Sequence, residues 1–151
     1  MADDAAVSAS CSTRGFLFVP EMSREVAPYR ASHLRDFAAL QEYSATLPEE
    51  TRGWMLALFV DSDFGLLSVE TIARDSISST QVSAERLIGR GLRLKAAGFF
   101  LVHNHPSGET TPRRIDIGFT RRLADICHDY GIPVICHVVV AKGKTTMLGG
   151  W

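Results

Sequence analysis

Residues 99–108 read Phe-Phe-Leu-Val-His-Asn-His-Pro-Ser-Gly, and this stretch predicts both a strand and a site. Its first four residues are all apolar, which is typical of a short central strand buried on both faces. The two histidines follow at the end of that strand, where open sheets expose functional groups. Because side chains two residues apart along a strand point to the same face, His103 and His105 can direct both imidazoles toward one point.

A carboxylate can join these imidazoles. Asp116 follows His105 by eleven residues, in the first turns of a predicted helix, and the intervening loop is long enough to fold it back. Two imidazoles and one carboxylate suit zinc, and three protein ligands leave a fourth position for water, as in catalytic zinc sites. The spacing also allows a simpler interpretation, in which the histidines form a hydrogen-bonded polar turn.

The rest of the sequence predicts strands and helices in mixed order. Apolar runs bounded by turn residues predict strands at 16–19, 54–60, 66–73, 99–102, 134–140 and 145–148, with a hairpin turn at 61–65. Helical spacing predicts helices at 32–43, from Ser83 to about Ala97, and at 112–130. This order predicts an α/β or α+β sandwich with a sheet between helices.

Caps and apolar faces define the second and third of these helices. Ser83 and Thr111 are suitable N-caps, Pro112 suits a first helical position, and Gly98 and Gly131 are expected to end the two helices. The apolar face of the second helix is expected to contain Leu87, Ile88, Leu92 and Leu94, and that of the third Ile115, Phe119, Leu123 and Ile126.

Composition excludes several classes of protein. With 151 residues, a hydrophobic fraction of 46% and a net charge of -1, the chain fits one globular domain without a global attraction to nucleic acid. Three cysteines without CxxC spacing argue against a disulfide framework. The longest apolar run, Trp54–Val60, is too short to cross a membrane, and the acidic start is unlike a secretory signal. We therefore expect a cytoplasmic protein.

One motif resembles a known family. The run His103-Asn104-His105-Pro106-Ser107-Gly108, with Thr111-Pro112 and Asp116 after it, resembles the signature of RadC-like proteins in the JAB/MPN (JAMM) metallohydrolase superfamily. The resemblance covers roughly residues 48–151 and continues through Leu58-Phe59-Val60-Asp61, Glu70, Val82, Ala96-Ala97, Gly131-Ile132-Pro133 and His137. We expect residues 1–14 to be a disordered tail and residues 15–47 to be an N-terminal extension with one helix.

The resemblance implies a fold, a cofactor and a reaction. It implies a cytidine-deaminase-like α/β/α sandwich whose central mixed sheet is flanked by helices. It also implies one zinc ion per chain, bound by His103, His105 and Asp116. The implied reaction is hydrolysis of a peptide or isopeptide bond, in which a glutamate takes a proton from zinc-bound water.

Two positions depart from the family pattern. Gly53 stands where the general-base glutamate is expected, and Glu49 or Glu50, slightly upstream, could replace it or could form an exposed acidic turn. Arg113 stands where the pattern has a serine that stabilises the developing oxyanion. The arginine could supply a charged donor there or could block the cleft. Ser107, Thr110 and Thr111 are nearby substitutes for the serine, although Thr111 also fits a helix cap.

Other polar groups have simpler interpretations. By residue type, Cys127-His128 and Cys136-His137 resemble a second metal site. However, we expect Cys127 to lie in the core and His128 to lie at a solvent-exposed helix end. We expect His137 to be buried and to support the metal ligands through a hydrogen bond. A basic stripe of Arg113, Arg114, Arg121 and Arg122 is expected to face solvent, where it could contact DNA or an acidic protein partner.

From this resemblance we expect a zinc-dependent metallohydrolase of the metallopeptidase or isopeptidase type, either fully active or weakened by the changes at Gly53 and Arg113. The alternative is a non-catalytic zinc-binding module that interacts with protein or DNA.

Overall fold

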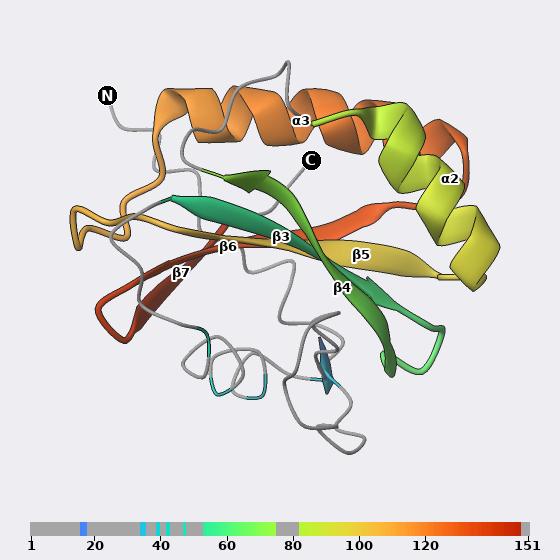
Figure 1. Cartoon of the computed structure of the whole chain (residues 1–151), viewed down its shortest axis with the longest axis horizontal. Coiled ribbons are helices and arrows are strands. Elements are labelled where there is room, and N and C mark those ends of the chain that lie inside the picture. The colour runs from blue at the N-terminus through green and yellow to red at the C-terminus, as the bar shows by residue number, and fades with distance from the viewer. Residues whose placement is uncertain are drawn as a thin grey trace.

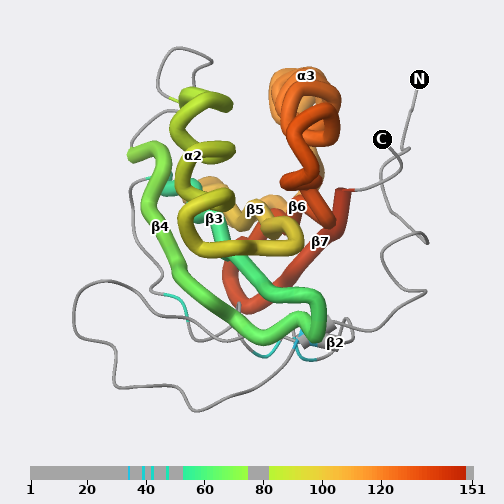
Figure 2. Tube along the Cα trace, turned by 90° about the vertical axis from the view of Figure 1, so that its right-hand side faces the viewer, coloured from blue at the N-terminus to red at the C-terminus, as the bar shows by residue number. Residues whose placement is uncertain are grey.

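In the computed structural model, a mixed five-stranded sheet carries two helices on one face (Figures 1 and 2). The structure describes residues 16–17, 34–35, 39, 42, 47, 53–74 and 82–148. The strands of the sheet are β3 (Trp54–Val60), β4 (Leu66–Arg74), β5 (Gly98–Asn104), β6 (Val134–Ala141) and β7 (Lys144–Leu148). The helices are α2 (Ala84–Leu94) and α3 (Arg114–Asp129). An α/β fold with a mixed sheet flanked by helices is confirmed.

The strand order is β4-β3-β5-β6-β7, in which β5 and β6 are parallel and the other neighbours are antiparallel. Every residue of β3 and β5 is buried, as the continuous apolar runs predict for central strands. The predicted strands lie within two residues of the observed bounds at each end. The central position of β5 holds its carboxyl end, and so His103, rigidly between β3 and β6.

Helix α2 begins as predicted, because the Ser83 hydroxyl accepts the Arg86 N–H at 3.2 Å. Its predicted end is wrong. The helix stops at Leu94, because Lys95 adopts the left-handed conformation with φ 55°. Gly98 instead opens β5, where a Cβ atom would lie 2.8 Å from the Pro133 carbonyl oxygen of the neighbouring strand segment. The prediction for Leu92 is also wrong, since its side chain is 56% exposed.

Helix α3 begins two residues later than predicted. Its N-cap is Arg113 and not Thr111, because the Asp116 carboxylate accepts the Arg113 backbone N–H at 2.9 Å and starts the helical turn there. Phe119 and Leu123 are buried against the sheet, as predicted. The apolar face is narrower than expected, because Ile115 and Ile126 are exposed. Gly131, with φ 74°, follows the end of the helix as predicted.

The predicted helix at 32–43 is wrong at its start. Leu34–Arg35 forms a short strand, β2, which pairs with β1 (Phe16–Leu17). Leu34 is fully buried and its N–H donates to the Phe64 carbonyl at 3.1 Å, so a tertiary contact overrides the local helical pattern. Ala39 and Glu42 are helical, and the remaining residues of this prediction lie outside the described part of the chain.

The sheet separates two hydrophobic cores. One core lies between the sheet and α2 and α3, and includes Phe99, Leu101, Phe119 and Leu123. The other lies on the opposite face, where Leu34 and Leu47 pack against residues such as Phe100 and Val102. No helix in the described ranges has both the length and the apolar character to cross a membrane.

Candidate metal centre

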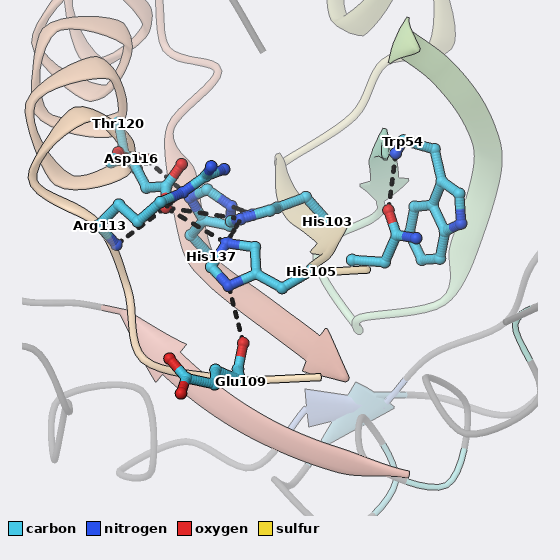
Figure 3. Close-up of polar contacts among 9 residues, drawn as sticks. Trp54, His103, His105, Glu109, Arg113, Asp116, Thr120 and His137 are labelled. Atoms are coloured by element: carbon cyan, nitrogen blue, oxygen red, sulfur yellow. Dashed lines mark hydrogen bonds and ion pairs between the residues drawn. The ribbon is translucent and has the colours of Figure 1, made fainter. Parts of the chain in front are cut away.

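Strand β5 places the two histidines of the motif. His103 pairs with Met55 of β3 and with Val139 of β6, and its side chain lies on the face covered by α3 (Figure 3). His105 directly follows the strand, and its backbone N–H donates to the Val140 carbonyl at 2.9 Å. Both imidazoles are buried, and their Nε2 atoms lie 2.8 Å apart.

Helix α3 brings Asp116 to the same point. The carboxylate lies in the first turn, where the helix dipole favours negative charge, and the residue is fully buried. Its Oδ2 atom is 3.4 Å from His105 Nε2 and 3.7 Å from His103 Nε2. These three residues therefore form a buried group that could hold a metal ion (Figure 3).

The donor atoms fit a metal ion in number, type and spacing. Ligand atoms bound to a tetrahedral zinc ion are about 3.3 Å apart, given bonds of about 2.0–2.1 Å. The three observed separations lie between 2.8 and 3.7 Å. The Asp116 Oδ1 atom is also buried and has no hydrogen-bond partner among the described residues, which is costly unless a further positive group satisfies it. The residues present thus fit a divalent ion with two nitrogen ligands and one oxygen ligand.

Burial keeps the site in the protonation states that a metal requires. Burial and the neighbouring His137 hold the pKa of His103 well below its usual value. Burial by itself raises the pKa of the Asp116 carboxyl, but His105, His103 and Arg113 outweigh this and hold that pKa well below its usual range. Near neutral pH the site therefore offers a neutral His103 and an ionised Asp116.

Hydrogen bonds to the Nδ1 atoms orient both imidazoles, on the side of each ring opposite the Nε2 atom. His105 Nδ1 lies 2.8 Å from the Glu109 carbonyl oxygen. His103 Nδ1 lies 2.6 Å from Nε2 of His137, whose Nδ1 lies 2.7 Å from the Thr120 hydroxyl. His137 is fully buried, as predicted for a supporting residue, and burial lowers its pKa to about 3. Figure 3 shows this chain of contacts running from His103 to α3.

Thr120 also belongs to the site, although the sequence did not predict it. Its hydroxyl donates to the Asp116 carbonyl at 2.7 Å and meets His137 on the other side. A signal was present, because residues four apart lie on the same helix face and a helical threonine can bond to the carbonyl four residues before it.

Among the candidate oxyanion donors, Arg113 contacts the ligand set. Its Nε is 3.2 Å from Asp116 Oδ2, while its side chain is 60% exposed. Ser107 is exposed, and its hydroxyl accepts a long 3.5 Å contact from the Glu109 N–H. Gly53 precedes β3 and is partly exposed, and Glu49 and Glu50 lie outside the described residues.

The alternative second metal site is not formed. Within the described ranges, His103, His105 and Asp116 are the one group with metal-like spacing. Cys127 and Cys136 are buried, and burial raises the pKa of the Cys127 thiol to about 11. His128 is exposed, as predicted. The four arginines of the basic stripe, Arg113, Arg114, Arg121 and Arg122, are all exposed.

Comparison with known proteins finds one matching family and several relatives. The RadC-like JAB domain family matches residues 33–149. A UPF0758 protein of Pseudomonas syringae pv. tomato is 34% identical over 116 residues, which are 76% of this chain and 52% of the relative. One from Desulforamulus reducens is 38% identical over 97 residues, 64% of this chain and 43% of the relative. The chain thus spans about half the length of these relatives.

Proposed function

This chain belongs to the RadC-like JAB domain family, and from that premise we propose that it is a zinc-dependent hydrolase of the JAMM type. Its substrate would be a peptide, isopeptide or related amide bond. The observation that supports this proposal is the buried convergence of His103, His105 and Asp116. Three ligands from one strand end and one helix leave a coordination position for a reactant, as catalytic zinc sites do.

The chain supplies ligands, a proton acceptor and an oxyanion donor. A zinc ion bound there would provide Lewis acidity, which lowers the pKa of water and polarises an amide carbonyl. The carboxylate of Glu50 or Glu49 would accept the proton of the attacking water and pass it to the leaving amine nitrogen. The Arg113 guanidinium, or the Ser107 hydroxyl, would donate a hydrogen bond to the oxyanion that develops on the carbonyl oxygen.

The metal centre can be tested first, without any substrate. We expect about one zinc per chain in the purified protein, and loss of that zinc from the His103→Ala/His105→Ala double variant. The measurement is metal content by elemental analysis, with His128→Ala as the control because His128 is an exposed histidine outside the site. Unchanged zinc content in the double variant would disprove this ligand assignment.

The proton acceptor needs a separate test. We expect the wild type to cleave fluorogenic peptide or isopeptide substrates. The Glu49→Gln/Glu50→Gln variant should lose about a hundredfold to ten-thousandfold in rate while retaining zinc. Glu85→Gln is the control, because Glu85 is exposed at the start of α2. A wild type whose activity survives both substitutions would show that another group accepts the proton.

One observation favours the non-catalytic alternative. Gly53 has no side chain to accept a proton, so the chain could use its zinc to stabilise a module that binds protein or DNA through the exposed basic stripe. In that case the wild type would be inactive, and Gly53→Glu would create activity. Substitution of Arg121 and Arg122 would weaken binding of a duplex DNA or acidic protein probe. An active wild type would decide against this alternative.

A further inference from the structure

A chain of buried hydrogen bonds leads from helix α3 to His103. The Thr120 hydroxyl lies 2.7 Å from the Asp116 carbonyl oxygen and 2.7 Å from His137 Nδ1. His137 Nε2 then lies 2.6 Å from His103 Nδ1. Thr120, His137 and His103 are all fully buried, so solvent does not compete for these contacts (Figure 3).

The positions of the protons in this series of hydrogen bonds follow from what each group can donate. The Asp116 carbonyl oxygen can only accept, so its short contact with Thr120 requires the single hydroxyl proton of Thr120. His137 Nδ1 must therefore carry the proton of its own contact with Thr120. A neutral imidazole has one N–H, so His137 Nε2 is an acceptor, and the proton it accepts belongs to His103 Nδ1.

This arrangement of protons determines whether His103 directs a lone pair or an N–H toward the metal centre. With its proton on Nδ1, His103 directs the lone pair of Nε2 toward Asp116 and His105. His105 is in the same state, because its Nδ1 meets the Glu109 carbonyl, which can only accept. Without this order, a proton on His103 Nε2 would form a 2.8 Å hydrogen bond to His105 Nε2 and occupy the position that a metal needs.

We propose that Thr120 and His137 are positioning residues that hold His103 in the Nδ1-protonated tautomer and so keep its Nε2 lone pair available to a metal ion. The inference concerns the metal centre on which the proposed function rests, but it does not require the protein to be a hydrolase. Thr120 sets the polarity on the Nδ1 side of His103, because its hydroxyl proton is committed to the Asp116 carbonyl, an obligate acceptor.

The tautomer can be observed directly in the full chain after zinc is removed by chelation. Nitrogen-15 NMR of the imidazoles distinguishes protonated from unprotonated ring nitrogens. We expect His103 to carry its proton on Nδ1 in the wild type and in Thr120→Ser, which retains the hydroxyl. In Thr120→Val, which has a similar shape but no hydroxyl, we expect the proton to shift toward Nε2.

Zinc affinity provides the second readout, measured by competition with a chelator. Loss of such a supporting contact typically weakens metal binding about tenfold to a hundredfold, so we expect this loss in Thr120→Val and near wild-type affinity in Thr120→Ser. If Thr120→Val does not fold, Thr120→Cys fills the same space with a weaker donor and acceptor and should show a smaller change in the same direction.

The outcomes separate this inference from the proposed function. A wild type with its His103 proton on Nε2, or a folded Thr120→Val with unchanged tautomer and zinc affinity, would overturn the positioning role. A variant that only melts at a lower temperature, with tautomer and affinity unchanged, would assign Thr120 a structural role and equally overturn it. Failure of the zinc-ligand test with His103→Ala/His105→Ala would instead remove the metal centre and leave the tautomer result standing.

Discussion

The Arg113 guanidinium lies against the same carboxylate that is a candidate metal ligand. Its Nε is 3.2 Å from Asp116 Oδ2, and its positive charge also lowers the pKa of His103. A cation at this distance opposes the binding of a divalent ion, but the side chain is 60% exposed, so water screens much of the repulsion. Arg113 is therefore the oxyanion donor of the proposed function and, by its charge, is expected to weaken metal binding moderately.

Replacing this arginine should improve zinc binding and reduce catalysis. We expect Arg113→Ser to raise zinc affinity by up to about fivefold, since an exposed charge contributes roughly 1 kcal/mol or less. The fold should be retained, because the backbone N–H of residue 113 makes the bond to Asp116 and serine is a favourable N-cap. Chelator competition measures the affinity, with Arg114→Ser as the neighbouring exposed control. A tenfold loss of affinity in Arg113→Ser would contradict this electrostatic interpretation.

Helix α3 carries the candidate ligand Asp116 but is held in place by apolar contacts. Phe119, Leu123, Ala124 and Cys127 of this helix are buried in the core above the sheet. Asp116 contributes to helix stability through its bond to the Arg113 N–H, a kind of cap contact that is typically worth about 1 kcal/mol. The helix should therefore remain docked when the metal is absent.

We accordingly expect Asp116→Ala to lose most of its metal affinity while staying folded, with a loss of unfolding free energy of about 1 kcal/mol from the cap. Circular dichroism, urea denaturation and zinc content measured on the same sample would check this, with Asp125→Ala on the exposed side of α3 as the control. Outright unfolding of Asp116→Ala would mean that the metal is required for the fold and that the site is structural.

The buried histidines make the free energy of unfolding of the whole protein depend on pH. Burial lowers the pKa of His137 from 6.5 to about 3, and burial with the nearby His137 also lowers the pKa of His103. In the unfolded chain both imidazoles take up a proton below their ordinary pKa, whereas in the folded chain they stay neutral. Acid therefore favours the unfolded state, and the stability is fully present only above about pH 6.5.

We expect the unfolding free energy of the zinc-free protein to fall as the pH is lowered from 6.5 toward 3, by about 1.4 kcal/mol per pH unit from His137, with a further fall in the same direction from His103. Urea denaturation at a series of pH values would measure this slope. His128→Asn should leave the slope unchanged, because His128 is exposed. A profile that is flat through this range would show that neither imidazole is held neutral by the fold.

Local sequence patterns are sufficient to predict the central strands, the mixed order of elements and the three candidate ligands. Continuous apolar runs predict β3 and β5, because strands that are buried on both faces are mostly apolar along their length. The His-Asn-His spacing at the end of β5 identifies the pair of imidazoles, because strand geometry alone sends both to one side. These predictions depend on local periodicity, which a single sequence contains.

The features that local patterns did not predict depend on contacts between distant residues, which form only in the tertiary structure. It paired Leu34–Arg35 with β1 and bonded Leu34 to Phe64, it ended α2 at Leu94 where Lys95 adopts the left-handed conformation, and it placed Gly98 beside Pro133. It also placed the Thr120 hydroxyl against His137, seventeen residues away. Hydrogen-bond polarity passes through space from one element to the next, so no local pattern could indicate which nitrogen of His103 carries the proton.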